Sequence, residues 1–197
     1  MGTTSPAAVR VRAGVLVPAL LVAGLVAAGA VTLWAMGHPL FCRCGQIALW
    51  SGDIWSNQNS QQVADPYSFT HLTHGVLFFW GLYGLRRWIG LPWRLVVAMA
   101  IEVAWEIAEN TPYVINRYRE ATISLDYVGD SVLNSTCDAL FCLIGFAIAS
   151  KLPGRAALAG IVVIEVVLAL TIRDGLLLNI VMLLVPIPAV REWQAAR

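Results

Sequence analysis

Apolar segments of roughly helical-span length recur along the chain and are separated by short polar stretches. A helix crosses the apolar part of a bilayer with about 20 mostly apolar residues. The pattern therefore predicts an all-α, polytopic transmembrane helical bundle of about six spans, near residues 13–36, 67–85, 93–110, 126–150, 156–172 and 175–190. Because the last stretch is short, five spans plus a re-entrant or interfacial segment is the alternative.

The segments outside the predicted spans are small. Residues 1–12 form a short tail, residues 13–197 form a single membrane domain, and residues 37–66 form its one long polar loop. Hydrophobic residues make up 58% of the chain and charged residues only 13%, against about 45–50% and 25% in soluble domains. The net charge of +1 gives no reason to expect nucleic-acid binding.

The distribution of basic residues predicts the orientation of the bundle. With six spans, nine of the 13 Lys and Arg residues fall on the side of the N-terminus and four on the opposite side. Cytoplasmic loops carry the excess of Lys and Arg. We therefore expect a multi-pass protein of the bacterial inner membrane, with both termini cytoplasmic and loop 37–66 periplasmic.

Acids and histidines interrupt three of the predicted spans. Within each span they are three or four residues apart, or sums of these, so each set lies on one helix face. A charged side chain at the bilayer centre costs about 2.5–3.5 kcal/mol even on the mildest scale. With the predicted orientation the three sets converge in the outer half of the bilayer. They are His71 and His74, then Glu102, Glu106 and Glu109, and then Asp126, Asp130, Asn134 and Asp138.

This mixture of imidazoles and carboxylates is typical of metal sites inside helical bundles. Nitrogen and oxygen ligands together suit zinc, iron or manganese. The candidate ligands are His71, His74, Glu106 and Asp130. The candidate catalytic acids and bases are Glu106, Asp130, Glu109, Glu102 and Asp126. The candidate supporting residues around them are Asn134, Asp138, Arg117, Arg119 and Arg173.

Other interpretations of the same residues stay open. The acids could relay protons without a metal in a small transporter or ion-binding protein. They could also form a purely structural network with the loop arginines, in a non-enzymatic assembly partner. Separately, Cys42 and Cys44 form a C-x-C pair, which is too short for a relaxed disulfide and too sparse for a complete zinc site. It is a candidate redox or metal-handling pair.

Sequence blocks over most of the chain after residue 35 resemble a family of small, uncharacterised bacterial inner-membrane proteins. The resemblance implies membership and no activity. The pattern of a histidine, a glutamate and D-x3-N in successive spans is also faintly similar to VanZ-like membrane proteins. The blocks that carry the family resemblance include Asp65-Pro66-Tyr67, Trp105-Glu106-Ile107, Glu109-Asn110-Thr111-Pro112, Arg117 to Ser124, Gly129-Asp130-Ser131 and Arg173-Asp174.

Together these features predict an outward-facing polar site inside the membrane. We expect it to bind a divalent metal and to act on a lipid-linked or cell-envelope substrate, with the lipid bilayer as the surrounding partner. Apolar residues fill the inner half of the spans, and that favours a site open to one side only. The sequence leaves the reaction and the oligomeric state open.

Overall fold

Prolines and polar caps divide the apolar sequence into separate helices. The computed structural model describes residues 6–123 and 126–196, and within them it has eight α-helices, one 3-10 helix and no strand. The helices are α1 (Pro6–Ala35), α2 (Ser68–Gly81), η1 (Leu82–Arg87), α3 (Leu91–Glu109), α4 (Pro112–Ala121), α5 (Val132–Ala149), α6 (Gly154–Thr171), α7 (Leu176–Leu184) and α8 (Pro188–Ala195).

Three of these helices are long and apolar enough to cross a membrane. They contain the stretches Gly14–Ala35, Val132–Ala149 and Gly154–Thr171. The all-helical fold class is therefore confirmed, and a membrane location is compatible with the structure. Helix α2 has 14 residues, and α3 carries three carboxylates along its 19 residues. Six spans therefore stays a prediction.

The predicted sixth span is not one continuous helix. Helix α7 has nine residues, or about 14 Å at the usual rise, which is less than half of the apolar thickness of a bilayer. The backbone becomes extended at Val185, and α8 begins at Pro188. Proline has no backbone N–H to continue a helix, so Pro186 and Pro188 end the segment. The alternative of five spans plus a re-entrant or interfacial segment therefore also stays a prediction.

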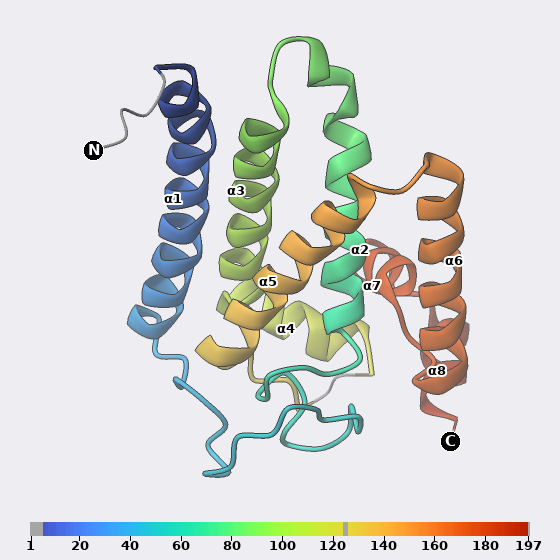
Figure 1. The fold of residues 1–197 in the computed structure, drawn as a ribbon. Helices are drawn as coiled ribbons and strands as arrows, with labels where there is room; N and C mark the ends of the chain where they lie inside the picture. The colour runs from blue at the N-terminus through green and yellow to red at the C-terminus, as the bar shows by residue number, and fades with distance from the viewer. Residues whose placement is uncertain (1–5, 124–125, 197) are drawn as a thin grey trace.

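The centre of the fold is the crossing of α2 and α5 (Figure 1). A Cβ atom on Gly75 would collide with the backbone carbonyl of Cys142, and one on Gly145 would collide with that of Leu72. Small residues let two helix backbones approach closely in this way. Helices α3 and α5 also pack against each other, and α1 lies along α3. The crossing therefore fixes the position of α2 along its own axis relative to the neighbouring helices.

Helix α4 occupies a segment that the sequence analysis treated as a loop. Thr111 caps it by accepting a hydrogen bond from the Val114 N–H, and Pro112 occupies the first turn. In Figure 1, α4 runs crosswise at the end of the bundle where α2 and α5 begin. The same end is covered by the long loop 37–66. Helix α4 and the loop thus enclose one end of the bundle.

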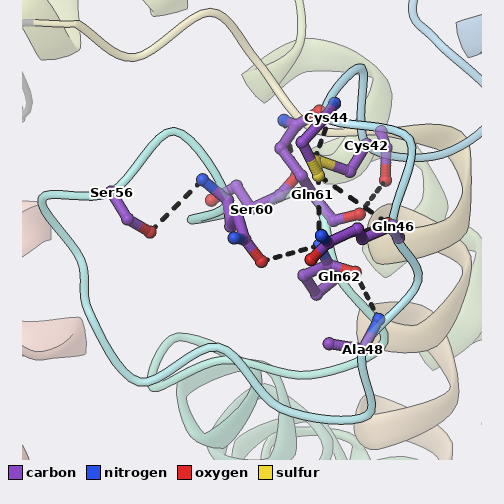
Figure 2. The surroundings of a disulfide bond; sticks show 10 residues. Cys42, Cys44, Gln46, Ala48, Ser56, Ser60, Gln61 and Gln62 are labelled. Atoms are coloured by element: carbon purple, nitrogen blue, oxygen red, sulfur yellow. Dashed lines mark hydrogen bonds between the residues drawn. A yellow bond between two sulfur atoms is a disulfide. The ribbon is translucent and has the colours of Figure 1, made fainter.

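Loop 37–66 is attached to the helices by hydrogen bonds. Ser131 N donates to the carbonyl of Ser60 at 3.0 Å, and Asn134 Nδ2 donates to that of Gln62 at 3.0 Å. Gln62 is fully buried and accepts a hydrogen bond from the Ala48 N–H at 2.7 Å. Figure 2 shows the contact between Gln62 and Ala48 beside Cys42 and Cys44, whose sulfur atoms form a disulfide. The C-x-C spacing, which suggested no relaxed disulfide, is bridged in the structure.

Candidate functional site

Two histidines of α2 face two glutamates of α3 inside the bundle. His71 Nδ1 lies 2.7 Å from Glu102 Oε1, and His74 Nδ1 lies 3.0 Å from Glu102 Oε2. Glu102 therefore bridges both imidazoles with its two oxygens, and it has no exposed surface. We call His71, His74, Glu102 and Glu106 the His–Glu cluster.

Helix periodicity explains how the cluster forms. His71 and His74 are three residues apart on α2, and Glu102 and Glu106 are four apart on α3. Residues at these separations lie on one face of a helix, one turn apart. The two faces oppose each other, so the imidazoles and carboxylates meet in the interface between α2 and α3. This convergence was expected from the spacing.

Glu106 is the least satisfied member of the cluster. Its Oε1 lies 3.0 Å from His71 Nδ1, but neither of its carboxylate oxygens makes a hydrogen bond of good geometry within the described part of the chain. Only 2% of the residue is exposed. A buried carboxylate without hydrogen bonds is costly. Glu106 therefore has unused acceptor capacity pointed into the protein.

Asp130 lies next to the cluster, in a network of its own. Its carboxylate accepts hydrogen bonds from Asn110 Nδ2 at 2.7 Å and from the Tyr127 hydroxyl at 2.8 Å. The Asp130 N–H donates to Asn110 Oδ1 at 2.7 Å. Burial raises the pKa of Asp130 above its ordinary value, although these two side-chain hydrogen bonds oppose that shift. Asp130 and Asn110 thus hold the start of α5 against the end of α3.

His38, in loop 37–66, completes this network. Its Nδ1 lies 3.0 Å from the Asp130 carbonyl, and its Nε2 lies 3.0 Å from the Asn110 carbonyl. Gly129 has φ of +85°, and a Cβ there would meet His38 Cε1 at 2.5 Å. Only glycine combines this backbone conformation with such a close approach. No local sequence pattern links His38 to these partners, which are 72 and 92 positions away.

The structure does not place all four residues 126, 130, 134 and 138 on one helix. Helix α5 begins at Val132 with Ser131 as its cap, so Asp126 and Asp130 precede it, and Asp126 is exposed. The expected four-residue stripe is wrong at these two positions because Gly129 adopts a left-handed conformation there. Asp138 lies on α5, where it accepts a hydrogen bond from the Ser68 hydroxyl at 2.7 Å.

The three candidate supporting arginines lie apart from the His–Glu cluster. Arg117 Nε donates to the Leu183 carbonyl at 2.8 Å, and Arg119 Nε donates to the Tyr127 carbonyl at 2.6 Å. Arg173 Nη1 donates to the Trp193 carbonyl at 2.9 Å. Among the described residues, the ion pairs all belong to His71 and His74 with the glutamates of α3. Within residues 6–123 and 126–196, these three arginines form no ion pair with the acids.

A cavity opens beside the cluster. Its polar wall includes His71, His74, Glu109 and Asp138. Helix α7 also contributes to its lining, with the apolar side chains Leu176, Ile180 and Leu183, spaced four and three residues apart, together with Asn179. The lining of the cavity therefore combines polar and charged groups from α2, α3 and α5 with apolar side chains from α7.

These features define an all-helical protein with three helices apolar enough to cross a membrane and a His–Glu cluster at one end of its bundle. The profile of the family described as "Protein of unknown function (DUF2585)" matches residues 33–196. The UPF0314 protein of Sphingopyxis alaskensis is 46% identical over 181 residues, which is 89% of this chain and 94% of that protein. UPF0314 protein R03235 of Rhizobium meliloti is 52% identical over 81% of each chain.

The chain therefore belongs to the DUF2585 family, whose curated relatives carry the name UPF0314. A further relative, from Paracoccus denitrificans, is 46% identical over 83% of this chain and 84% of its own length. No solved structure matches the chain. The family resemblance seen in the sequence is thus confirmed, and the comparisons give no support to the fainter similarity to VanZ-like proteins.

Proposed function

We propose that this protein is a multi-pass protein of the bacterial inner membrane that binds one divalent metal ion in the His–Glu cluster. The observation that carries the proposal is that His71, His74 and Glu102 each offer a ligand atom, with all of these atoms within 4.8 Å of one another. Zinc bound by nitrogen and oxygen at 2.0–2.1 Å has tetrahedral ligands about 3.3 Å apart. The Nδ1–oxygen distances of 2.7 and 3.0 Å need only a small expansion to reach that value.

Glu106 supports the same assignment. Its two carboxylate oxygens are buried and make no hydrogen bond among the described residues. The nearer one, Oε1, lies 3.0 Å from His71 Nδ1. A metal ion would convert this unfavourable burial into a favourable one by taking Glu106 as a further ligand. The ligand set is then two imidazoles and two carboxylates, which suits zinc, iron or manganese. This set replaces Asp130, which the sequence had grouped with the ligands, by Glu102.

The mixture of polar and apolar side chains that line the cavity supports an amphiphilic substrate. A polar group of the substrate would face the histidines, while an apolar chain would lie along Leu176, Ile180 and Leu183 of α7. An ion that takes more than four ligands, such as iron or manganese, would keep a position open beside these side chains. It would act there as a Lewis acid on a phosphoryl or carbonyl oxygen, or would lower the pKa of a bound water. We infer that the substrate is lipid-linked and belongs to the cell envelope. The chemistry would be metal-assisted, with Asp138 and Glu109 on the cavity wall available for proton transfer.

The test is metal binding by the detergent-purified full-length protein. After incubation with zinc, iron or manganese and removal of the excess, we expect about one equivalent of metal per chain. The variants His74→Ala and Glu102→Gln should lose it, because each removes a ligand. Asp126→Asn is the matched control, since Asp126 is exposed and outside the cluster, and it should retain the metal.

Cobalt substitution gives a second readout that does not depend on metal counting. Bound cobalt should show visible absorption in the wild-type protein, and this absorption should disappear in Glu102→Gln. A wild-type protein that binds no metal under any condition would contradict the proposal. It would leave the cluster as a metal-free pair of histidines and glutamates, suited to proton handling in a small transporter.

A further inference from the structure

The end of the bundle opposite the His–Glu cluster carries an unbalanced positive charge. The connection from α2 to α3 and the connection from α5 to α6 both lie at this end (Figure 1). The sequence has no Asp or Glu between Asp65 and Glu102, and none between Asp138 and Glu165. Nothing acidic in these two segments offsets the basic residues there, which are Arg86, Arg87, Arg94, Lys151 and Arg155.

Arg94 differs from the other four because it is buried. Only 7% of it is exposed, and its Nε and Nη1 atoms have no hydrogen-bond partner among the described residues. A guanidinium group stays protonated in proteins, so it cannot escape the cost of burial by becoming neutral. A buried charge is expected to be paired. Arg94 has no acid near it in its own segment.

Aromatic rings surround the Arg94 guanidinium without satisfying its donors. Its Cζ lies 5.4 Å from the ring centroid of Phe79 and 5.9 Å from that of Tyr83. Such cation–π contacts hold the group in place, but they accept no hydrogen bond from Nε or Nη1. The Arg86 guanidinium also lies over the Tyr83 ring, with its Cζ 4.2 Å from the ring centroid. Two guanidinium groups therefore share one aromatic ring.

Besides the two Arg94 donors, the same cluster of aromatic side chains contains a third buried donor, which belongs to Trp80. The indole Nε1 of Trp80 is buried and has no hydrogen-bond partner in the described chain. Trp80 lies 5.1 Å from Tyr83 and 5.2 Å from Phe79 between ring centroids. The start of α6 closes this side, because a Cβ on Gly154 would come within 3.4 Å of the Trp80 ring. This cluster of side chains thus contains three buried donor atoms and a positive charge, and the described residues supply no acceptor for them.

We propose that Arg94 and its aromatic neighbours bind a phosphate-bearing anion, and that its source is the headgroup of an anionic phospholipid. A planar guanidinium binds a phosphate through two parallel hydrogen bonds. Basic pockets between helices on the cytoplasmic side of a membrane are suited to such headgroups. Trp88 and Trp93 are exposed near the same end, as aromatic residues are at the level of lipid headgroups. This proposal does not depend on the metal site.

The test compares lipid retention by native mass spectrometry of the full-length protein in detergent. The wild type should retain one phosphatidylglycerol about tenfold more strongly than phosphatidylcholine, as expected for charge-assisted hydrogen bonds. Arg94→Gln should remove this preference. Arg155→Gln is the matched control, because it deletes the same charge from an exposed residue at the same end, and it should keep the preference.

Two results would overturn the proposal. One is equal retention of the two lipids by the wild type. The other is equal loss in Arg94→Gln and Arg155→Gln, which would reduce the effect to general surface charge. If Arg94→Gln does not stay folded by circular dichroism, Arg94→Lys replaces it, since lysine keeps the charge but not the planar fork. Retention by Arg94→Lys equal to that of Arg155→Gln would then also overturn it.

Adding inorganic phosphate distinguishes a lipid headgroup from a soluble phosphate as the bound anion. Phosphate at millimolar concentration should leave the retained phosphatidylglycerol in place if the site recognises a lipid. If phosphate displaces the lipid and raises the melting temperature of the wild type but not of Arg94→Gln, the anion site is supported and its ligand is a soluble phosphate.

Discussion

Replacing Asp174 by asparagine should stabilise the protein at neutral pH, although it removes a well-bonded side chain. Asp174 lies in the turn between α6 and α7 and is 1% exposed. It accepts hydrogen bonds from the Tyr67 hydroxyl at 2.9 Å, the Gly175 N–H at 2.9 Å and Gln194 Nε2 at 3.2 Å. It therefore links the start of α2 to α8. Burial nevertheless raises the pKa of Asp174 from 3.8 to about 6.

The direction of the effect follows from proton linkage. A carboxyl group whose pKa is higher in the folded protein than in the unfolded chain favours folding when it is protonated. This contribution is complete below pH 3.8 and is lost as the pH rises through about 6. A shift of about two units corresponds to about 3 kcal/mol at neutral pH. For a chain of this size, that is roughly 6–12 °C in melting temperature as an upper limit.

The assay is thermal unfolding of wild type and Asp174→Asn in detergent between pH 4 and pH 8. The other buried acids titrate in both proteins, so the difference between the two melting temperatures isolates Asp174. We expect Asp174→Asn to be more stable by several degrees at pH 7.5 and equal to wild type near pH 4. Asp126→Asn, at an exposed acid, is the matched control for removing one carboxylate charge. A variant that is less stable than wild type at pH 7.5 would refute the reasoning, because the three hydrogen bonds would then outweigh the desolvation.

The glycines provide the remaining predictions. Gly75→Ala and Gly145→Ala each place a Cβ against backbone atoms of the facing helix, so both should greatly reduce the yield of monodisperse protein, whereas Gly81→Ala, in open space, should not. Gly129→Ala should destabilise the fold by more than Gly45→Ala in thermal unfolding, because both positions have positive φ but only Gly129 also faces other side chains. The backbone penalty alone is about 1–2 kcal/mol, and equal losses in the two variants would show that the contact with His38 is unimportant.

The sequence predicted the helices best where a proline or a polar cap marks an end. Pro112 ends α3 as expected, since α3 stops at Glu109. The same residues also begin α4, with Thr111 as cap, a short helix that the pattern of apolar spans does not predict. The segment after Gly175 is not one continuous helix, because its apolar composition hides the break at Val185. Composition alone does not show where a helix stops.

The site was predictable where it depends on one helix and unpredictable where it depends on distant contacts. The opposing pairs on α2 and α3 follow from spacing alone. The central role of Glu102 does not, because spacing ranks Glu102, Glu106 and Glu109 equally. Only the height at which α3 packs against α2 brings Glu102 between the two histidines. The position of His38 likewise depends on the path of loop 37–66.

The helix crossing and the His–Glu cluster are physically one feature. Gly75 directly follows His74 in α2, and α5 approaches α2 so closely there that a side chain does not fit. Because one side of α2 is closed by α5, the histidines face α3, where Glu102 and Glu106 are buried. An added methyl group at Gly75 would push α2 away from α5 and change its height beside α3. The Nδ1–oxygen distances of 2.7 and 3.0 Å leave little room for that movement. Any Gly75→Ala protein that does fold should therefore bind metal more weakly than wild type, although residue 75 carries no ligand atom.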